Sequence, residues 1–149
     1  MISFDEKKFN DLSPKTLHDI FALRSEVFVL EQHCIYQDID GKDIEAIHII
    51  GKEKRGIVAY ARILNTKKTT PNVISIGRIV ISKRKRGKGY GHKLVDFCLD
   101  VIKKREIKRT IKISAQEHLK EFYEHHGFII RGEGYLEDGI PHIEMIIKN

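Results

Sequence analysis

A basic, glycine-rich segment at residues 86–91 has the composition of an anion-binding loop. It reads Arg-Gly-Lys-Gly-Tyr-Gly and closely follows the β-favouring apolar run 76–81. Because glycine has no side chain, the backbone can lie against a phosphate with its N–H groups directed at it, and the dipole of a following helix strengthens the attraction. The segment predicts a phosphate cradle between a strand and the N-terminus of a helix.

The spacing of the three glycines discriminates between phosphate-binding patterns. The dinucleotide pattern G-x-G-x-x-G fails in both registers, because its third glycine would fall on His92 or Leu94. The P-loop pattern fails because no Gly-Lys-Ser/Thr follows at the required distance. Arg86, Gly89 and Gly91 match Arg-x-x-Gly-x-Gly. Taken alone, this short motif fits an ordinary basic strand-to-helix turn equally well, so the rest of the chain must decide.

Hydrophobic periodicity and turn residues predict the elements that position this segment. Strands are expected at residues 2–4, 46–50, 57–64, 73–81, 110–114, 128–132 and 143–147. Helices are expected at residues 14–30, 89–104 and 118–125, the first opened by the start signal Ser13-Pro14. The second helix has an apolar face of Leu94, Val95, Cys98, Leu99 and Ile102. Irregular segments are expected at residues 31–41 and 65–72, and long loops of this kind are often functional.

The order of these elements predicts an α/β (α+β) fold. Strand–helix–strand segments imply parallel neighbours, whereas short turns such as Asp138-Gly139 imply antiparallel ones. The expected result is a mixed, twisted sheet with helices on both faces. With 149 residues and 41% hydrophobic content, the chain is expected to form one domain over residues 1–149.

The net charge of +6 and the pI near 9.3 favour an anionic partner. Basic residues cluster at 83–88, which overlaps the glycine loop and so indicates a small phosphorylated ligand, and at 103–109, which fits a solvated helix end. Nucleic acid is disfavoured as a partner because no helix-turn-helix, RNP or zinc-finger pattern is present. Cys34 and Cys98 form no C-x-x-C pair and no H-E-x-x-H occurs, so neither a disulfide scaffold nor a metal site is expected.

Membrane and export signals are not found in the sequence. No apolar run approaches the roughly 20 residues needed to cross a bilayer. Residues 1–10 contain no apolar stretch of signal-peptide length. We therefore expect a cytoplasmic protein without a membrane partner.

Several separated motifs together resemble the GNAT N-acetyltransferase superfamily, and within it the bacterial ElaA group. The Arg-x-x-Gly-x-Gly loop resembles the acetyl-CoA pyrophosphate loop of the superfamily, and residues 116–128, which contain Phe-Tyr-x-x-x-Gly-Phe, resemble its second signature. The ElaA-like features are Arg24, 27–29, Glu31-Gln32, Tyr36, Asp38, Asp40-Gly41, 58–62, Gly77-Arg78 and 137–142. The chain departs from the pattern at Ile35, where proline is usual, and at Gln116, where many members have asparagine. The resemblance covers nearly the whole chain.

This resemblance implies a GNAT fold, with a mixed sheet of about seven strands flanked by about four helices, and acetyl-CoA as cosubstrate. The groups implied to hold the pyrophosphate are the backbone N–H groups of Arg86, Gly87, Lys88, Gly89, Tyr90 and Gly91, with His92 nearby. Charge on Arg86 and Lys88 adds to the binding. The pantetheine arm is implied to pair like an extra strand with Ile79, Val80 and Ile81, where a backbone N–H faces the thioester oxygen.

In this family context Tyr123 is the candidate general acid. A tyrosine has an ordinary pKa of about 10 and a thiol one near 8.5, so at pH 7 the phenol holds its proton until a thiolate forms. Without the context, Tyr123 would be interpreted as a core aromatic beside Phe122. The resemblance therefore implies that Tyr123 protonates the departing CoA sulfur.

The general base stays open among four side chains, His48, His142, Glu31 and Glu144. A histidine titrates near neutral pH and accepts an ammonium proton directly or through water. His48 and His142 lie on or beside predicted strands among apolar residues, where a hydrogen-bonded structural histidine is the commoner case.

Three arginines, Arg24, Arg62 and Arg78, have two interpretations. They hold a carboxylate or phosphate of the acceptor, or they pair with nearby acidic residues and pin the irregular segment 31–41. The acidic partners available are Asp38, Asp40 and Asp43. The pinning role is favoured.

The predicted function is transfer of the acetyl group of acetyl-CoA to a primary amine of a small molecule or peptide, with the acceptor unidentified. Two other classes stay open: a GNAT-like domain that binds CoA and regulates a partner without catalysis, and a nucleic-acid-binding module that uses the basic clusters. The presence of Tyr123 argues against the first of these. Either a monomer or a homodimer is expected.

Overall fold

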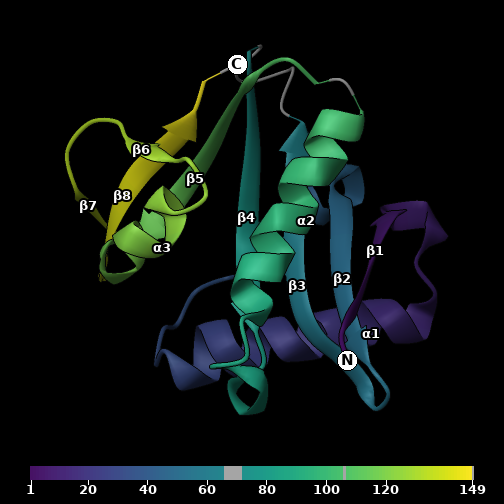
Figure 1. Cartoon of the computed structure of the whole chain (residues 1–149). Helices are drawn as coiled ribbons and strands as arrows, with labels where there is room; N and C mark the ends of the chain where they lie inside the picture. The colour runs from purple at the N-terminus through teal and green to yellow at the C-terminus, as the bar shows by residue number, and fades with distance from the viewer. Residues whose placement is uncertain (66–71, 106, 149) are drawn as a thin grey trace.

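Figure 1 shows the computed structural model, which describes residues 1–65, 72–105 and 107–148. The strands are β1 (Ser3–Lys8), β2 (Ile47–Glu53), β3 (Gly56–Asn65), β4 (Val73–Ile81), β5 (Thr110–Gln116), β6 (Ile129–Ile130), β7 (Tyr135–Glu137) and β8 (Ile140–Ile147). The helices are α1 (Pro14–Arg24), α2 (Tyr90–Lys104) and α3 (Lys120–Glu124), with a π-helical segment at Ser25–Glu31. Single 3-10 turns lie at Phe9–Asp11, Lys42–Glu45, Lys83–Lys85 and Glu117–Leu119. The predicted loop 65–72 lies mostly outside the described residues.

One mixed, twisted sheet contains all the described strands. Its order is β1-β2-β3-β4-β5-β8-β6, and β7 also pairs with β8. Among the described strands, only the β4–β5 pair is parallel. The predicted mixed sheet is confirmed. The described part of the chain has one strand more than expected, because the short strand β7 is exposed and shows no apolar alternation.

Helices cover both faces of the sheet, as predicted (Figure 1). On one face α2 buries Leu94, Val95, Cys98, Val101 and Ile102, while Leu99 of the predicted apolar face is only partly buried. The opposite face is covered by α1 and the π-helical segment that follows it. There, Ile20, Leu23 and Val27 pack against Ile50, Tyr60 and Val80.

The helix α1 starts at the predicted residue, Pro14, but the last part of the predicted helix 14–30 is π-helical and not α-helical. The hydroxyl of Ser13 accepts a hydrogen bond from the N–H of Thr16 at 3.1 Å, and Pro14 occupies the first helical position. The helical rise then continues from Ser25 to Glu31 with π-type bonding. Such wide turns are frequent beside functional sites. This one ends where the predicted irregular segment 31–41, called the irregular loop below, begins.

The strands β4 and β5 diverge soon after they pair. Ladder partners join only Val73–Ser75 to Thr110–Lys112. Within the described residues, 76–81 of β4 therefore have no backbone partner on the β5 side. Figure 1 shows β5 leaning away from β4 over this stretch. The backbone groups of residues 76–81 on this side are therefore left to pair with water or with a bound molecule.

A β-bulge lies on β4 within the same stretch. Tyr60 of β3 faces Val80 and Arg62 faces Gly77, so β4 carries one residue more than β3 between these two pairs. Arg78 at the bulge has φ of +50°, a left-handed conformation that is uncommon outside glycine.

Candidate active site

A pocket of about 660 Å³ opens where β4 and β5 diverge. One wall is β4 over residues 76–81, and the facing wall is β5 at Ile113, Ser114 and Gln116. The pocket is closed at one end by the first turn of α2 and by α3, and at the other by the irregular loop and the β7–β8 turn. It thus extends from the predicted cofactor loop to the irregular loop and the β7–β8 turn.

The glycine loop has the backbone geometry that a phosphate requires. Gly87 and Gly89 have φ of +79° and +76°, the left-handed region in which other residues are strained. Gly89 caps α2 without any side-chain hydrogen bond to the first turn. A Cβ on Gly91 would lie 3.3 Å from the Phe122 ring, so a larger residue would require that ring to move by a few tenths of an ångström. The first-turn N–H groups of a 15-residue helix are therefore left for an anion.

The side chains of the glycine loop are largely engaged in holding the loop. The Arg86 guanidinium donates to both carboxylate oxygens of Glu31 at 2.7 and 3.1 Å and to the Ile81 carbonyl at 3.1 Å. The Tyr90 hydroxyl donates to Glu53 at 2.7 Å, and this bond raises the pKa of Tyr90. Arg86 and Gly91 line the pocket, whereas Gly87, Lys88, Gly89 and Tyr90 do not. A bond to phosphate from these residues would come mainly from the backbone.

His92 lies outside the pocket lining, in a chain of polar contacts at the start of α2. Its Nδ1 is 2.8 Å from Nε2 of His126, whose Nδ1 is 2.9 Å from an Asp96 carboxylate oxygen. The Phe122 ring packs on His92 at 4.5 Å between centroids. Burial lowers the pKa of His126 despite Asp96. The cluster fixes the His92 ring beside the glycine loop.

The three β4 residues predicted to meet the pantetheine arm all line the pocket. The Val80 side chain is buried under α1, and those of Ile79 and Ile81 are partly buried. Their side chains thus belong to the two cores, and their backbone groups on the β5 side are the ones left without ladder partners. The bulge at Arg78 changes the direction of these groups.

Tyr123 lies in the pocket wall with its hydroxyl unengaged. The residue is 6% exposed, and its ring meets Phe122 and Phe128 edge-on at 5.0 and 6.0 Å. Its hydroxyl forms no hydrogen bond with any residue that the structure describes. Burial, to which the nearby Cys98 adds, raises the pKa of Tyr123 above its ordinary value. A proton on this phenol is therefore available to a group bound in the pocket.

His48 does not belong to the pocket, and the prediction of a base at this position is corrected. It is fully buried on the α1 side, where its Nε2 donates to the Asp43 carbonyl at 2.8 Å and its Nδ1 accepts from the Tyr60 hydroxyl at 2.7 Å. Burial lowers its pKa. Because both nitrogens are bonded within the core, neither can accept a proton from a substrate.

His142, by contrast, lines the pocket. Its Nδ1 donates to the Ile140 carbonyl at 2.7 Å, and its Nε2 lies 3.3 Å from a Glu137 carboxylate oxygen. The other two candidate bases are paired: Glu31 with Arg86, and Glu144 with Arg131 at 2.6 Å. Bonds from Arg131 lower the pKa of Glu144. Of the four candidates, His142 alone combines a place in the pocket with a nitrogen that accepts no hydrogen bond from the described residues.

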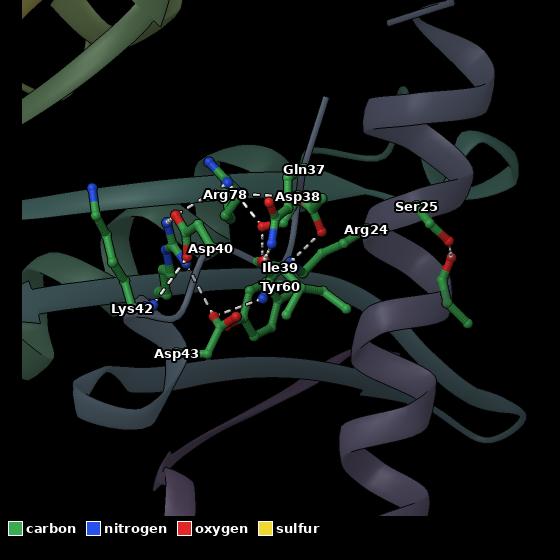
Figure 2. A network of polar contacts seen from close by, with 12 residues as sticks. Arg24, Ser25, Gln37, Asp38, Ile39, Asp40, Lys42, Asp43, Tyr60 and Arg78 are labelled. Carbon is green, nitrogen blue, oxygen red and sulfur yellow. Dashed lines mark hydrogen bonds and ion pairs between the residues drawn. The ribbon is translucent and has the colours of Figure 1, made fainter. Parts of the chain in front are cut away.

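Three arginines and three aspartates form a largely buried network that includes residues of the irregular loop, and Figure 2 labels Arg24, Arg78 and the three aspartates. Arg24 of α1 is fully buried and donates to Asp38 at 3.0 Å and to Asp43 at 2.7 Å. Arg62 joins Asp43 to Asp40, at 3.1 and 2.6 Å. The interpretation of these arginines as groups that pin the loop is confirmed, since their guanidinium groups are occupied by the three carboxylates.

The third arginine of the network, Arg78, connects the loop to the β4 bulge. Its Nε is 2.8 Å from a carboxylate oxygen of Asp38, and its NH2 group donates to the Asp38 carbonyl at 2.9 Å. Tyr36 lies under the Arg78 guanidinium and donates to Asp38 at 2.9 Å. Burial opposes ionisation of Asp40, but bonds from Arg62 and from the Lys42 N–H outweigh it and lower the pKa of Asp40. The irregular loop and the bulge of β4 are therefore held by the same charges.

Sequence reasoning does not single out Glu137 as a site residue. The signal that would find it is the Asp138-Gly139 turn, which pairs Glu137 with Ile140 in a tight hairpin and so places it beside His142. The turn is also tied to the irregular loop, because the Cys34 thiol donates to the Asp138 carbonyl at 3.4 Å.

Residues 1–65, 72–105 and 107–148 contain neither a helix that could span a membrane nor a cluster of metal-binding side chains. None of the helices there is long and apolar enough to cross a bilayer. No group of three or more His, Cys, Asp or Glu side chains there is arranged to hold a metal ion.

Comparisons with known proteins agree with this geometry. The profile of the acetyltransferase (GNAT) domain matches residues 9–149. UPF0039 protein sll0451 of Synechocystis is 42% identical to this chain, in an alignment that covers 99% of this chain and 96% of the relative. ElaA of Escherichia coli is 40% identical, in an alignment that covers 97% of this chain and 95% of the relative. The crystal structure of Escherichia coli ElaA superimposes with a TM-score of 0.92 at 38% identity, covering 98% of this chain and 99% of its own. That of an acyl-CoA N-acyltransferase from Pseudomonas aeruginosa gives the same TM-score and coverage at 36% identity.

Proposed function

Because the chain belongs to the GNAT acetyltransferase family and is ElaA-like, we propose that it transfers the acetyl group of acetyl-CoA to a primary amine. Family membership and the fold support acyltransferase activity. The acetyl group and the amine class are the finer parts of the proposal. The single observation that best supports the binding of an acyl-CoA cosubstrate is the run of unpaired β4 backbone that leads from the pocket to the glycine loop.

The length and chemistry of this run suit an extended cofactor arm. Six residues of a strand span roughly 20 Å, and the amides of a pantetheine arm can pair with the unpaired groups of residues 76–81 as an added strand would. The diphosphate then reaches the first turn of α2, where N–H groups and the helix dipole favour an anion. The thioester lies near the bulge, where a backbone N–H can polarise its oxygen.

Two side chains supply the proton transfers. His142 Nε2 takes a proton from the protonated amine, and the freed electron pair on nitrogen attacks the thioester carbon, so that a C–N bond forms and the carbonyl π pair moves to oxygen. The carbonyl then re-forms and the C–S bond breaks, with Tyr123 donating a proton to the departing sulfur. The nitrogen then loses its second proton to solvent, His142 releases the proton it took, and solvent returns one proton to Tyr123. One proton is released for each amide formed.

Calorimetry with acetyl-CoA and a transfer assay with a library of primary amines test the proposal. At a hundredfold excess over Kd, a ligand that binds only the folded chain stabilises it by about 2.7 kcal/mol, which for this chain length raises Tm by roughly 5–11 °C. Acetylated product should be detected by mass, because Cys34 and Cys98 would contribute background to thiol reagents. Absence of binding heat and of a Tm rise would refute the proposal. Binding without product from any amine would leave a CoA-binding domain without catalysis.

A further inference from the structure

The β7–β8 hairpin fixes the tautomer of His142. Asp138 and Gly139 have φ of +51° and +77°, so they form a tight two-residue turn that pairs Tyr135 with His142. The Ile140 carbonyl lies 2.7 Å from His142 Nδ1. A carbonyl only accepts hydrogen bonds, so Nδ1 carries the hydrogen. In the neutral ring, Nε2 is therefore the nitrogen with the lone pair.

That lone pair faces another acceptor. The Glu137 carboxylate oxygen lies 3.3 Å from Nε2, and an ionised carboxylate has no hydrogen to donate. His142 is 7% exposed, and no residue in the described part of the chain donates a hydrogen bond to its Nε2. Both residues line the pocket, so a bound donor can reach both acceptors. Two acceptors that converge without a donor define a position for a group with several N–H bonds.

We propose that Glu137 and His142 Nε2 form a subsite that binds the acceptor as its ammonium ion. This inference rests on the proposed function and adds to it a binding group for the protonated amine, Glu137. An ammonium has three N–H donors and can satisfy both acceptors at once. Primary and secondary ammonium ions fit this chemistry, whereas a quaternary ammonium does not.

The same arrangement carries the proton transfer. One N–H bond of the ammonium breaks, its electron pair stays on the nitrogen, and the proton moves to His142 Nε2. The imidazolium that results is an ion-pair partner for Glu137 at the same 3.3 Å separation. The ring has little freedom to turn away, because Tyr135 stacks on it at 6.2 Å and the Tyr135 hydroxyl is bonded to Ser114. The neutral amine is left at the pocket wall for attack.

A titration of the whole chain with two simple cations tests the subsite without knowledge of the acceptor. Methylammonium chloride and tetramethylammonium chloride are added at equal ionic strength, and the ring ¹⁵N signals of His142 are followed by NMR, assigned by their loss in His142→Gln. Methylammonium should shift the Nε2 signal in a saturable manner, and tetramethylammonium should not. In Glu137→Gln the apparent affinity for methylammonium should fall about tenfold, the usual effect of losing a hydrogen bond to a charged group.

Glu133→Gln is the matched control, because Glu133 is exposed in the segment between β6 and β7 and is outside the pocket lining. It should titrate like the original chain. Equal responses to the two cations, or equal methylammonium affinity in Glu137→Gln and Glu133→Gln, would overturn the subsite. The outcome is separable from that of the proposed function: methylammonium binding without amine acetylation would refute the enzyme and leave the subsite, and acetylation without methylammonium binding would do the reverse.

Discussion

Removal of one oxygen atom, in Tyr123→Phe, tests the assignment of the general acid. The ring of Tyr123 is held edge-on by Phe122 and Phe128, so phenylalanine should occupy the same place. The hydroxyl bonds to no described residue, and its loss should leave no unsatisfied partner behind. The free energy of unfolding is therefore expected to change by less than about 1 kcal/mol.

The expected effect on turnover is much larger. A positioned general acid contributes about 10²- to 10⁴-fold, which corresponds to roughly 2.7–5.4 kcal/mol of transition-state stabilisation. Because burial raises the pKa of the phenol, Tyr123 holds its proton at neutral pH until the thiolate forms. The affinity for acetyl-CoA should be retained, since the proposed cofactor contacts are backbone groups of β4 and α2.

Steady-state turnover with mass detection, calorimetry with acetyl-CoA and a melting curve together measure these effects. Tyr60→Phe is the matched control. Its hydroxyl is fully buried and donates to His48 Nδ1 at 2.7 Å, so its removal should cost about 1–3 kcal/mol of stability and leave kcat unchanged. The two variants should thus show opposite phenotypes. Normal turnover by Tyr123→Phe would show that Tyr123 is not the general acid. A loss of folding in that variant would contradict the observation that the Tyr123 hydroxyl bonds to no described residue.

Three further outcomes are expected. Asp43→Asn removes a buried charge between Arg24 and Arg62 and should lower the free energy of unfolding by about 3–5 kcal/mol, which corresponds to a Tm decrease of roughly 6–20 °C. The control variant Asp100→Asn, at an exposed position, should change the free energy of unfolding by less than about 0.5 kcal/mol. Equal Tm values for the two variants would disprove the network's contribution to stability. Burial lowers the pKa of His48, and bonds from Arg62 and the Lys42 N–H lower the pKa of Asp40. Each group contributes its full stability above its pKa in the unfolded chain, which is about 6.5 for histidine and about 4 for aspartate. That contribution is lost as the pH falls below the unfolded pKa. Melting curves from pH 7 to pH 3 should therefore show a loss in two stages, and a Tm that stays constant to pH 4 would contradict this. Gly89→Ala places a Cβ on a residue with φ of +76° and should lower the free energy of unfolding by about 1–2 kcal/mol. The variant should also bind acetyl-CoA more weakly in calorimetry. Unchanged affinity would argue against the glycine loop as the diphosphate cradle.

Sequence patterns predict the local units of this fold well. The central strand 73–81 has the predicted bounds, the helix that follows the glycine loop begins within one residue of expectation, and the Ser13 cap is formed as expected. Each of these depends on neighbours within a few residues, so the physical cause is present in the local sequence. The short strand β7 is not predicted, since its three exposed residues have no apolar period.

The two histidines show what local pattern leaves undecided. His48 and His142 both lie on strands among apolar residues, and their near environments in the sequence are similar. Successive strand residues point to opposite faces, and what covers each face is contributed by distant elements. The α1 face and the Tyr60 hydroxyl enclose His48, whereas the divergence of β4 from β5 opens a pocket beside His142.

By itself, the sequence determined the strand–glycine loop–helix unit, the alternation of elements and the residue types at the site, because these depend on backbone preferences and on periodicity over short distances. Only the tertiary structure decided where β4 and β5 separate, which histidine meets the pocket, and that Arg24, Arg62 and Arg78 are neutralised by loop carboxylates. These outcomes depend on strand register and on contacts between residues far apart in the chain, and no short window contains both partners.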